Sequence, residues 1–136
     1  MTLRFTARLV VAEVDADNDL MQAGVAEDQD GDGFFLLFMS NIAEPSAQNV
    51  SLGLDSHCVV TQAHGTAYGC VQEVTLSDRL LTVSLDPTSM DDLELEDPEI
   101  EAELDVPEED IERMRVVLAQ VLAFGRPDAR PRRVDL

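Results

Sequence analysis

The stretch Tyr68–Leu85, YGCVQEVTLSDRLLTVSL, decides the fold class of this chain. From Leu80 to Leu85, apolar side chains alternate with threonine and serine, a period of two that is typical of a strand with one buried face. The polar triplet Ser77–Arg79 separates this segment from a second apolar segment over 68–76 and is short enough for a tight turn. The stretch therefore predicts an antiparallel β-hairpin.

More strands are predicted on the N-terminal side of this hairpin. Segment 2–14 alternates apolar and polar residues at its start and is rich in β-branched and aromatic residues. Segments 20–26 and 54–62 are predicted as further strands and are bounded by polar or glycine-containing turns. Phe34–Met39, FFLLFM, is a continuous apolar run of strand length. Such a run indicates a central strand that is covered on both faces.

The C-terminal third predicts one more strand and a helix. Ile100–Leu104 alternates apolar and acidic residues, which suits an edge strand whose charges discourage pairing with another chain. Pro107 and the three acids after it begin a helix, and Gly125 ends it. The apolar stripe of this helix is Ile111, Met114, Leu118, Val121 and Leu122.

These elements predict an α+β fold, an antiparallel sheet of six or seven strands with a C-terminal helix packed on one face. Residues 1–125 form a single domain in this interpretation. Residues 126–136 contain two prolines, four of the nine arginines and no core pattern, and they predict a flexible tail.

The charge of the chain restricts the partners that it can bind. Twenty-eight acids face nine bases, which gives a net charge of -19, and the segment Asp86–Glu112 contains fourteen acids and no base. Such a field repels nucleic acid and anionic membranes and attracts a basic partner. Solubility or adaptation to salt is the alternative explanation. No apolar run reaches the length of a membrane span and no signal peptide is recognisable, so a cytoplasmic protein is expected.

The motif DQDGDG over 28–33 begins like the calcium-binding loop of an EF-hand. Asp28, Asp30 and Asp32 fit the first three ligand positions, but the positions of the later ligands hold Leu36 and Met39. Its flanks are predicted strands, and Asp-Gly between apolar strands is a strong hairpin signal. We therefore predict a hairpin turn, and weak calcium binding remains the alternative.

The cysteine and histidine side chains are candidate metal ligands and candidate members of a catalytic pair. Cys58 and Cys70 lie in apolar, strand-like segments and are expected to be reduced, structural thiols. Asp55, His57, Cys58 and His64 lie close in sequence, but neighbouring strand positions point to opposite faces, so a zinc site is not favoured. A pairing of one thiol with one histidine stays open at this stage. Nucleotide-binding and metalloprotease motifs are absent from the sequence, so no enzyme activity, metal or cofactor is predicted.

The middle of the chain resembles the immunity protein 10 family of bacterial polymorphic-toxin systems. The resemblance spans about residues 2–124 and depends on LGLDSHCVV, from Leu52, and TAYGCVQEV, from Thr66. The chain departs from the family pattern at Gln72, where a glutamate is expected, at His57-Cys58, where aromatic residues are expected, and by having no tryptophan. The resemblance implies an α+β protein that binds and neutralises a cognate toxin without catalysis.

The acidic composition leads in the same direction, because nuclease toxins need basic clefts to hold phosphate. The predicted contact surface consists of Asp55, Tyr68, Asp91, Asp92, Glu94, Glu96, Glu99, Glu101 and Glu103. The alternative is a non-catalytic interaction module of another pathway, including a homodimer formed through the acidic edge strand. The sequence leaves the choice between monomer and homodimer open.

Overall fold

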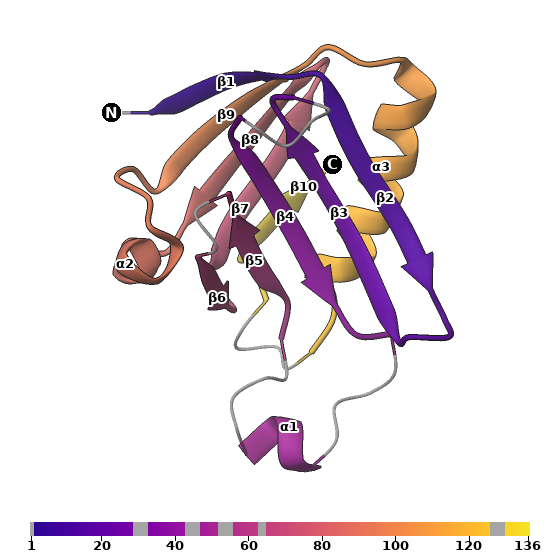
Figure 1. Cartoon of the computed structure of the whole chain (residues 1–136), viewed down its shortest axis with the longest axis vertical. Helices are drawn as coiled ribbons and strands as arrows, with labels where there is room; N and C mark the ends of the chain where they lie inside the picture. Colours follow the sequence, from indigo (N-terminus) through magenta and orange to yellow (C-terminus); the bar gives the residue numbers. More distant parts are fainter. Residues whose placement is uncertain (1, 29–32, 43–46, 52–55, 63–64, 126–129) are drawn as a thin grey trace.

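In the computed structural model, the described part of the chain contains ten strands in two five-stranded sheets (Figure 1). The structure describes residues 2–28, 33–42, 47–51, 56–62, 65–125 and 130–136. Sheet I has the strand order β1 (Leu3–Ala7), β9 (Glu99–Leu104), β8 (Leu80–Leu85), β7 (Val71–Ser77) and β10 (Arg133–Asp135). Sheet II has the order β2 (Leu9–Asp15), β3 (Leu20–Ala26), β4 (Phe35–Ser40), β5 (Cys58–Thr61) and β6 (Thr66–Tyr68). The α+β class is confirmed, but the prediction of a single sheet is wrong.

The two sheets diverge at Arg8, in the middle of the predicted strand 2–14. The carbonyl oxygen of Ala7 accepts a hydrogen bond from Asp105 N (2.8 Å) beyond β9, whereas Arg8 N donates to Ala26 O (3.0 Å) at the end of β3. The backbone therefore changes partners at one residue, and β1 and β2 enter different sheets. Local alternation cannot reveal this change, because both halves of the segment have strand composition.

A second change of sheet occurs at Gly69, within the predicted strand 68–76. Gly69 has a φ of 64°, a left-handed conformation that glycine adopts easily, and its N–H donates to His57 O (2.9 Å). Tyr68 thus ends β6 in sheet II, and Val71 begins β7 in sheet I. The β7–β8 hairpin itself is confirmed, with Ser77 paired to Leu80 across the turn.

Sheet II is a meander in which every neighbouring pair is antiparallel. Sheet I is mixed, because β1 pairs with β9 and β10 pairs with β7 in parallel. The prediction that β9 is an edge strand is wrong, since β1 and β8 occupy both of its sides. β10 lies in the segment for which the sequence predicts a flexible tail.

Helix α3 (Glu108–Leu122) covers the inner face of sheet II over β2, β3 and β4 (Figure 1). The predicted stripe is confirmed, because all five of its residues are buried. Together with both sheets they form one core cluster, in which Phe38 of β4, Leu81 of β8 and Met114 of α3 are fully buried. Two short helices are also described: α1 (Ala47–Ser51), and α2 (Met90–Leu93), which adds the buried Leu93 to the core cluster.

Candidate functional site

The acids of α2 are presented beside the edge of sheet II. Thr61 Oγ1 donates to Leu93 O (2.8 Å), and a Cβ at Gly65 would lie 2.5 Å from the Leu93 carbonyl carbon, so α2 packs directly on the β5–β6 hairpin. Asp86 caps the 3-10 turn before α2, accepting from Thr88 N (2.9 Å), and this hydrogen bond lowers the pKa of Asp86. Four predicted contact residues in and directly after α2, hereafter the α2 acids, are exposed: Asp91, Asp92, Glu94 and Glu96.

The acids of β9 lie on a different surface. Ile100, Ala102 and Leu104 are buried, so Glu99, Glu101 and Glu103 point to the outer face of sheet I. Ser84 Oγ donates to Glu99 Oε1 (2.7 Å), and the Arg4 guanidinium lies 3.8 Å from the Glu101 carboxylate. The structure therefore separates the predicted contact residues into two groups.

Tyr68 is the aromatic residue of the predicted contact surface, and its side chain is 46% exposed. It stands opposite Cys58 in the β5–β6 pair, and Cys58 stands opposite Met39 of β4. A hollow of about 160 Å³ opens at this point and is lined by Leu20, Met39, Ser40, Asn41, Ser56, Cys58 and Tyr68. Since α2 contacts β6, Tyr68 and the α2 acids belong to neighbouring elements. Asp55 lies outside the described residues.

His57 and the two cysteines contribute to the packing of the fold. His57 is fully buried, and its Nε2 accepts a hydrogen bond from Val71 N (3.2 Å), which ties β5 to β7. Burial lowers the pKa of His57 to about 4 and raises the pKa values of Cys58 to about 11 and of Cys70 to about 12. The thiols and the imidazole are therefore neutral at neutral pH, which is unfavourable for nucleophilic attack by a thiolate.

The DQDGDG segment is described only at its ends, since residues 29–32 lie outside the described part. Glu27 N donates to Phe34 O (2.8 Å), and Phe34 N donates to Glu27 Oε1 (3.1 Å). The flanks of the motif are thus the paired strands β3 and β4, as predicted, and not the helices of an EF-hand. Among the described residues, no three His, Cys, Asp or Glu side chains form a metal-binding group. The hairpin turn over 28–33, and weak calcium binding as its alternative, stay predictions.

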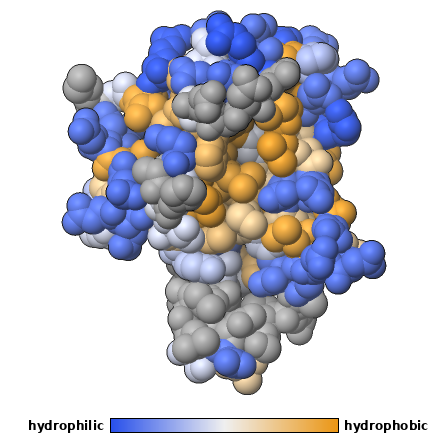
Figure 2. All heavy atoms as spheres, in the orientation of Figure 1, coloured by the Kyte–Doolittle hydropathy of each residue, from blue (hydrophilic) through white to orange (hydrophobic). Residues whose placement is uncertain are grey.

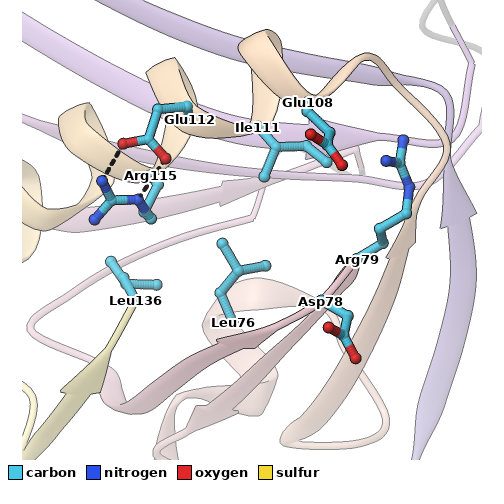
Figure 3. Close-up of a pocket in the computed structure, with 8 residues that line it drawn as sticks. All are labelled: Leu76, Asp78, Arg79, Glu108, Ile111, Glu112, Arg115 and Leu136. Atoms are coloured by element: carbon cyan, nitrogen blue, oxygen red, sulfur yellow. Dashed lines mark hydrogen bonds and ion pairs between the residues drawn. The ribbon is translucent and has the colours of Figure 1, made fainter.

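A groove of about 500 Å³ lies between α3 and the β7–β8 turn (Figure 3). Its apolar lining is Leu76, Ile111 and Leu136, and its rim carries charged residues from the turn and from α3. Glu112 and Arg115 on this rim bind each other (Nε to Oε2, 3.0 Å), which lowers the pKa of Glu112 and raises that of Arg115. Sequence reasoning missed this groove because three distant segments form it.

Two comparisons of the whole chain, one with curated proteins and one with solved structures, give no match. The profile of a protein family, described as Immunity protein 10, matches residues 6–112. The chain belongs to the Immunity protein 10 family. The match runs from β1 through both sheets into the first turns of α3, so it includes Tyr68 and both groups of acids. The resemblance noted in the sequence is confirmed. No helix among the described residues has the length and hydropathy needed to cross a membrane.

Proposed function

We propose that this chain is an acidic immunity protein that binds a cognate bacterial toxin and neutralises it by protein–protein contact, without catalysis. Membership in the Immunity protein 10 family is the observation that carries this proposal. The raised pKa values of both thiols and the lowered pKa of His57 support a non-catalytic role, because none of these groups is activated. The cytoplasm is its proposed place of action.

The toxin surface that contacts this chain is proposed to be basic. Acids outnumber bases by twenty-eight to nine, and several of the bases are engaged within the protein. Arg113 pairs with Asp110 and Arg132 with Glu73, while Arg79 donates to the carbonyl oxygen of Leu104. The net field therefore attracts a cationic surface and accelerates its encounter.

The proposed contact begins at α2 and Tyr68. The α2 acids are exposed on, or directly after, a short helix that is fixed to the β5–β6 hairpin. Tyr68 of β6 is a half-exposed aromatic residue of the kind that anchors interfaces. Asp55 is included as a proposal from its place in the sequence. Glu99, Glu101 and Glu103 form a second acidic area on sheet I, whose contribution the experiment below can separate.

A homodimer built by pairing of β9 edges is not compatible with the sheet order, because β9 already has two neighbours. A homodimer formed through another surface, and a role as an interaction module of another pathway, remain alternatives. Neither is favoured by a particular contact in the structure, so a one-to-one complex with a toxin is the arrangement proposed.

The test is co-expression of the chain with the toxin domain encoded beside its gene. We expect the chain to restore growth and to elute with the toxin as a stable complex. A chain that neither protects cells nor binds the purified toxin would refute the proposal.

A charge-neutralising variant of α2 tests the proposed steering. Asp91→Asn, Asp92→Asn and Glu94→Gln together should lower the association rate about tenfold at low salt. The control Asp78→Asn, Asp105→Asn and Glu109→Gln removes the same charge from exposed positions near the β7–β8 turn. A third variant, Glu99→Gln, Glu101→Gln and Glu103→Gln, shows whether sheet I takes part. Equal rates for the α2 variant and the control would contradict a contact at α2.

A further inference from the structure

The outer face of sheet II is apolar although no described helix or second sheet covers it. We define this face by six half-buried side chains from β2, β4 and β5: Leu9, Val11, Phe35, Leu37, Met39 and Val60. Val11 and Leu37 flank Gly24 in register, and Val60 stands opposite Leu37, so the three side chains form one row across the sheet. Figure 2 shows apolar atoms gathered on this side between hydrophilic margins.

These side chains point away from the core. Val10 and Ala12 of β2 pack against the core and, with Asp110 and Arg113 of α3, line one small pocket. Alternation along the strand therefore turns Val11 to the opposite face. In β4, Leu36 and Phe38 are fully buried on the inner side, and Leu37 lies between them.

An antiparallel sheet with one solvated face normally carries polar residues on that face. Strand β4 breaks this rule, because all three of its outward residues, Phe35, Leu37 and Met39, are apolar. The run FFLLFM predicts a central strand that is covered on both faces, and β4 is the central strand of sheet II. Within the described structure α3 and the core cover only one of these faces. A continuous apolar surface of this kind marks an interaction site.

We propose that the outer face of sheet II is the apolar centre of the toxin contact, and that its occupant is a toxin surface with apolar residues surrounded by arginine or lysine. This proposal rests on the immunity function proposed above. The charges at the edges of the face favour a basic partner over a second copy of this chain. Glu13 and Asp15 are the only charged residues in the five strands of sheet II, and the α2 acids lie beside the opposite edge. A second copy of this chain would bring acids against acids in any face-to-face arrangement, whereas a basic rim would neutralise both edges.

The size of the face fits the centre of an interface. From β2 to β5, three spacings of about 4.8 Å and strands of about six residues at about 3.3 Å each give a flat area of roughly 300 Å². A stable complex buries about 800 Å² on each partner, with an apolar centre and a polar rim. The face would supply about a third of this area, and α2, Tyr68 and the β2–β3 turn would supply the rest.

The test measures binding of the purified toxin domain, encoded beside the gene, to four forms of the full chain. Leu37→Glu places a charge at the middle of the face and should weaken binding at least about 100-fold. Leu80→Glu is the matched control, because Leu80 is a half-buried leucine that points outward from β8 in the other sheet. Val60→Thr is a milder variant that keeps the shape of the side chain and should weaken binding several-fold even if Leu37→Glu does not fold. Circular dichroism and thermal unfolding verify the fold of each variant.

The outcomes separate this inference from the proposed function. Wild-type affinity in folded Leu37→Glu and Val60→Thr variants would refute the docking face and leave the immunity function intact. A wild-type chain that does not bind the toxin would refute the immunity function and, with it, the occupant named here. Sedimentation of the chain alone should give a monomer. A dimer that Leu37→Glu dissociates would assign the face to a second copy and refute the toxin as its occupant.

Discussion

The buried imidazole of His57 should make this protein sensitive to mild acid in a way that one substitution removes. His57 is fully buried, its Nε2 accepts a hydrogen bond from Val71 N, and burial lowers its pKa from 6.5 to about 4. The unfolded chain binds a proton at this residue below pH 6.5, whereas the folded protein does not bind it until the pH is near 4. The contribution of His57 to the free energy of unfolding is therefore fully present above pH 6.5, and it is lost as the pH falls from 6.5 to about 4.

The size of the effect follows from the shift. A difference of about 2.5 pH units at about 1.36 kcal/mol per unit gives a loss of about 3 kcal/mol from this residue alone. This is a large part of the free energy of unfolding of a small domain, which is typically about 5–15 kcal/mol. The many carboxylates also titrate as the pH falls, so the contribution of His57 must be measured as a difference.

The assay is urea unfolding of wild type and of His57→Gln at several pH values. Glutamine does not titrate and keeps an acceptor for Val71 N, so its disadvantage near neutral pH should shrink by about 3 kcal/mol as the pH falls to 4. Ser56→Ala, at the buried neighbouring position, is the control. The difference between its free energy of unfolding and that of wild type should be independent of pH. A constant difference for His57→Gln, or an NMR titration of His57 near pH 6.5 in the folded protein, would refute the reasoning.

Three further predictions concern packing and thiol chemistry. Met114→Ala should destabilise the fold by about 2–5 kcal/mol in urea unfolding, because a fully buried side chain of α3 is removed from the core. Gly65→Ala should lower the melting temperature and loosen α2, since its Cβ would lie 2.5 Å from the Leu93 backbone; unchanged melting would contradict this close approach. Cys58 and Cys70 should react with a disulfide reagent about 100-fold or more slowly than a free thiol near neutral pH and faster as the pH rises, and rapid labelling of the folded protein would contradict their raised pKa values.

The local elements of the fold could be predicted because local residues determine them. The β7–β8 hairpin needs only a polar turn between two apolar runs, and the stripe of α3 follows from spacing within fifteen residues. The prediction of where strands pair failed for a physical reason. The parallel pairing of Leu3 with Ile100 joins segments that are far apart in the sequence, and its energy depends on neighbours that no short window contains.

The functional residues show the same division. Exposure of the α2 acids could be predicted from their charge and lack of periodicity. The separation of Glu99, Glu101 and Glu103 from the α2 acids could not be predicted, because it depends on the position of β9 between β1 and β8 in sheet I. The run FFLLFM contained the signal for the apolar face, but only the place of α3 identifies which of its two faces is left uncovered.

The change of partners at Arg8 has a consequence for the order in which the protein is assembled during synthesis. All strands of sheet II lie between residues 9 and 68, so their pairing partners are available while the ribosome is still making the second half of the chain. Sheet I must wait, because β1 needs β9 and because β7 is joined by β10, which follows α3 in the sequence. Strand β1 is therefore made before every strand of sheet II, but it is paired after them. Until then, the nascent chain carries an apolar meander whose inner face has not yet received α3, and this interval is when the protein is most exposed to aggregation.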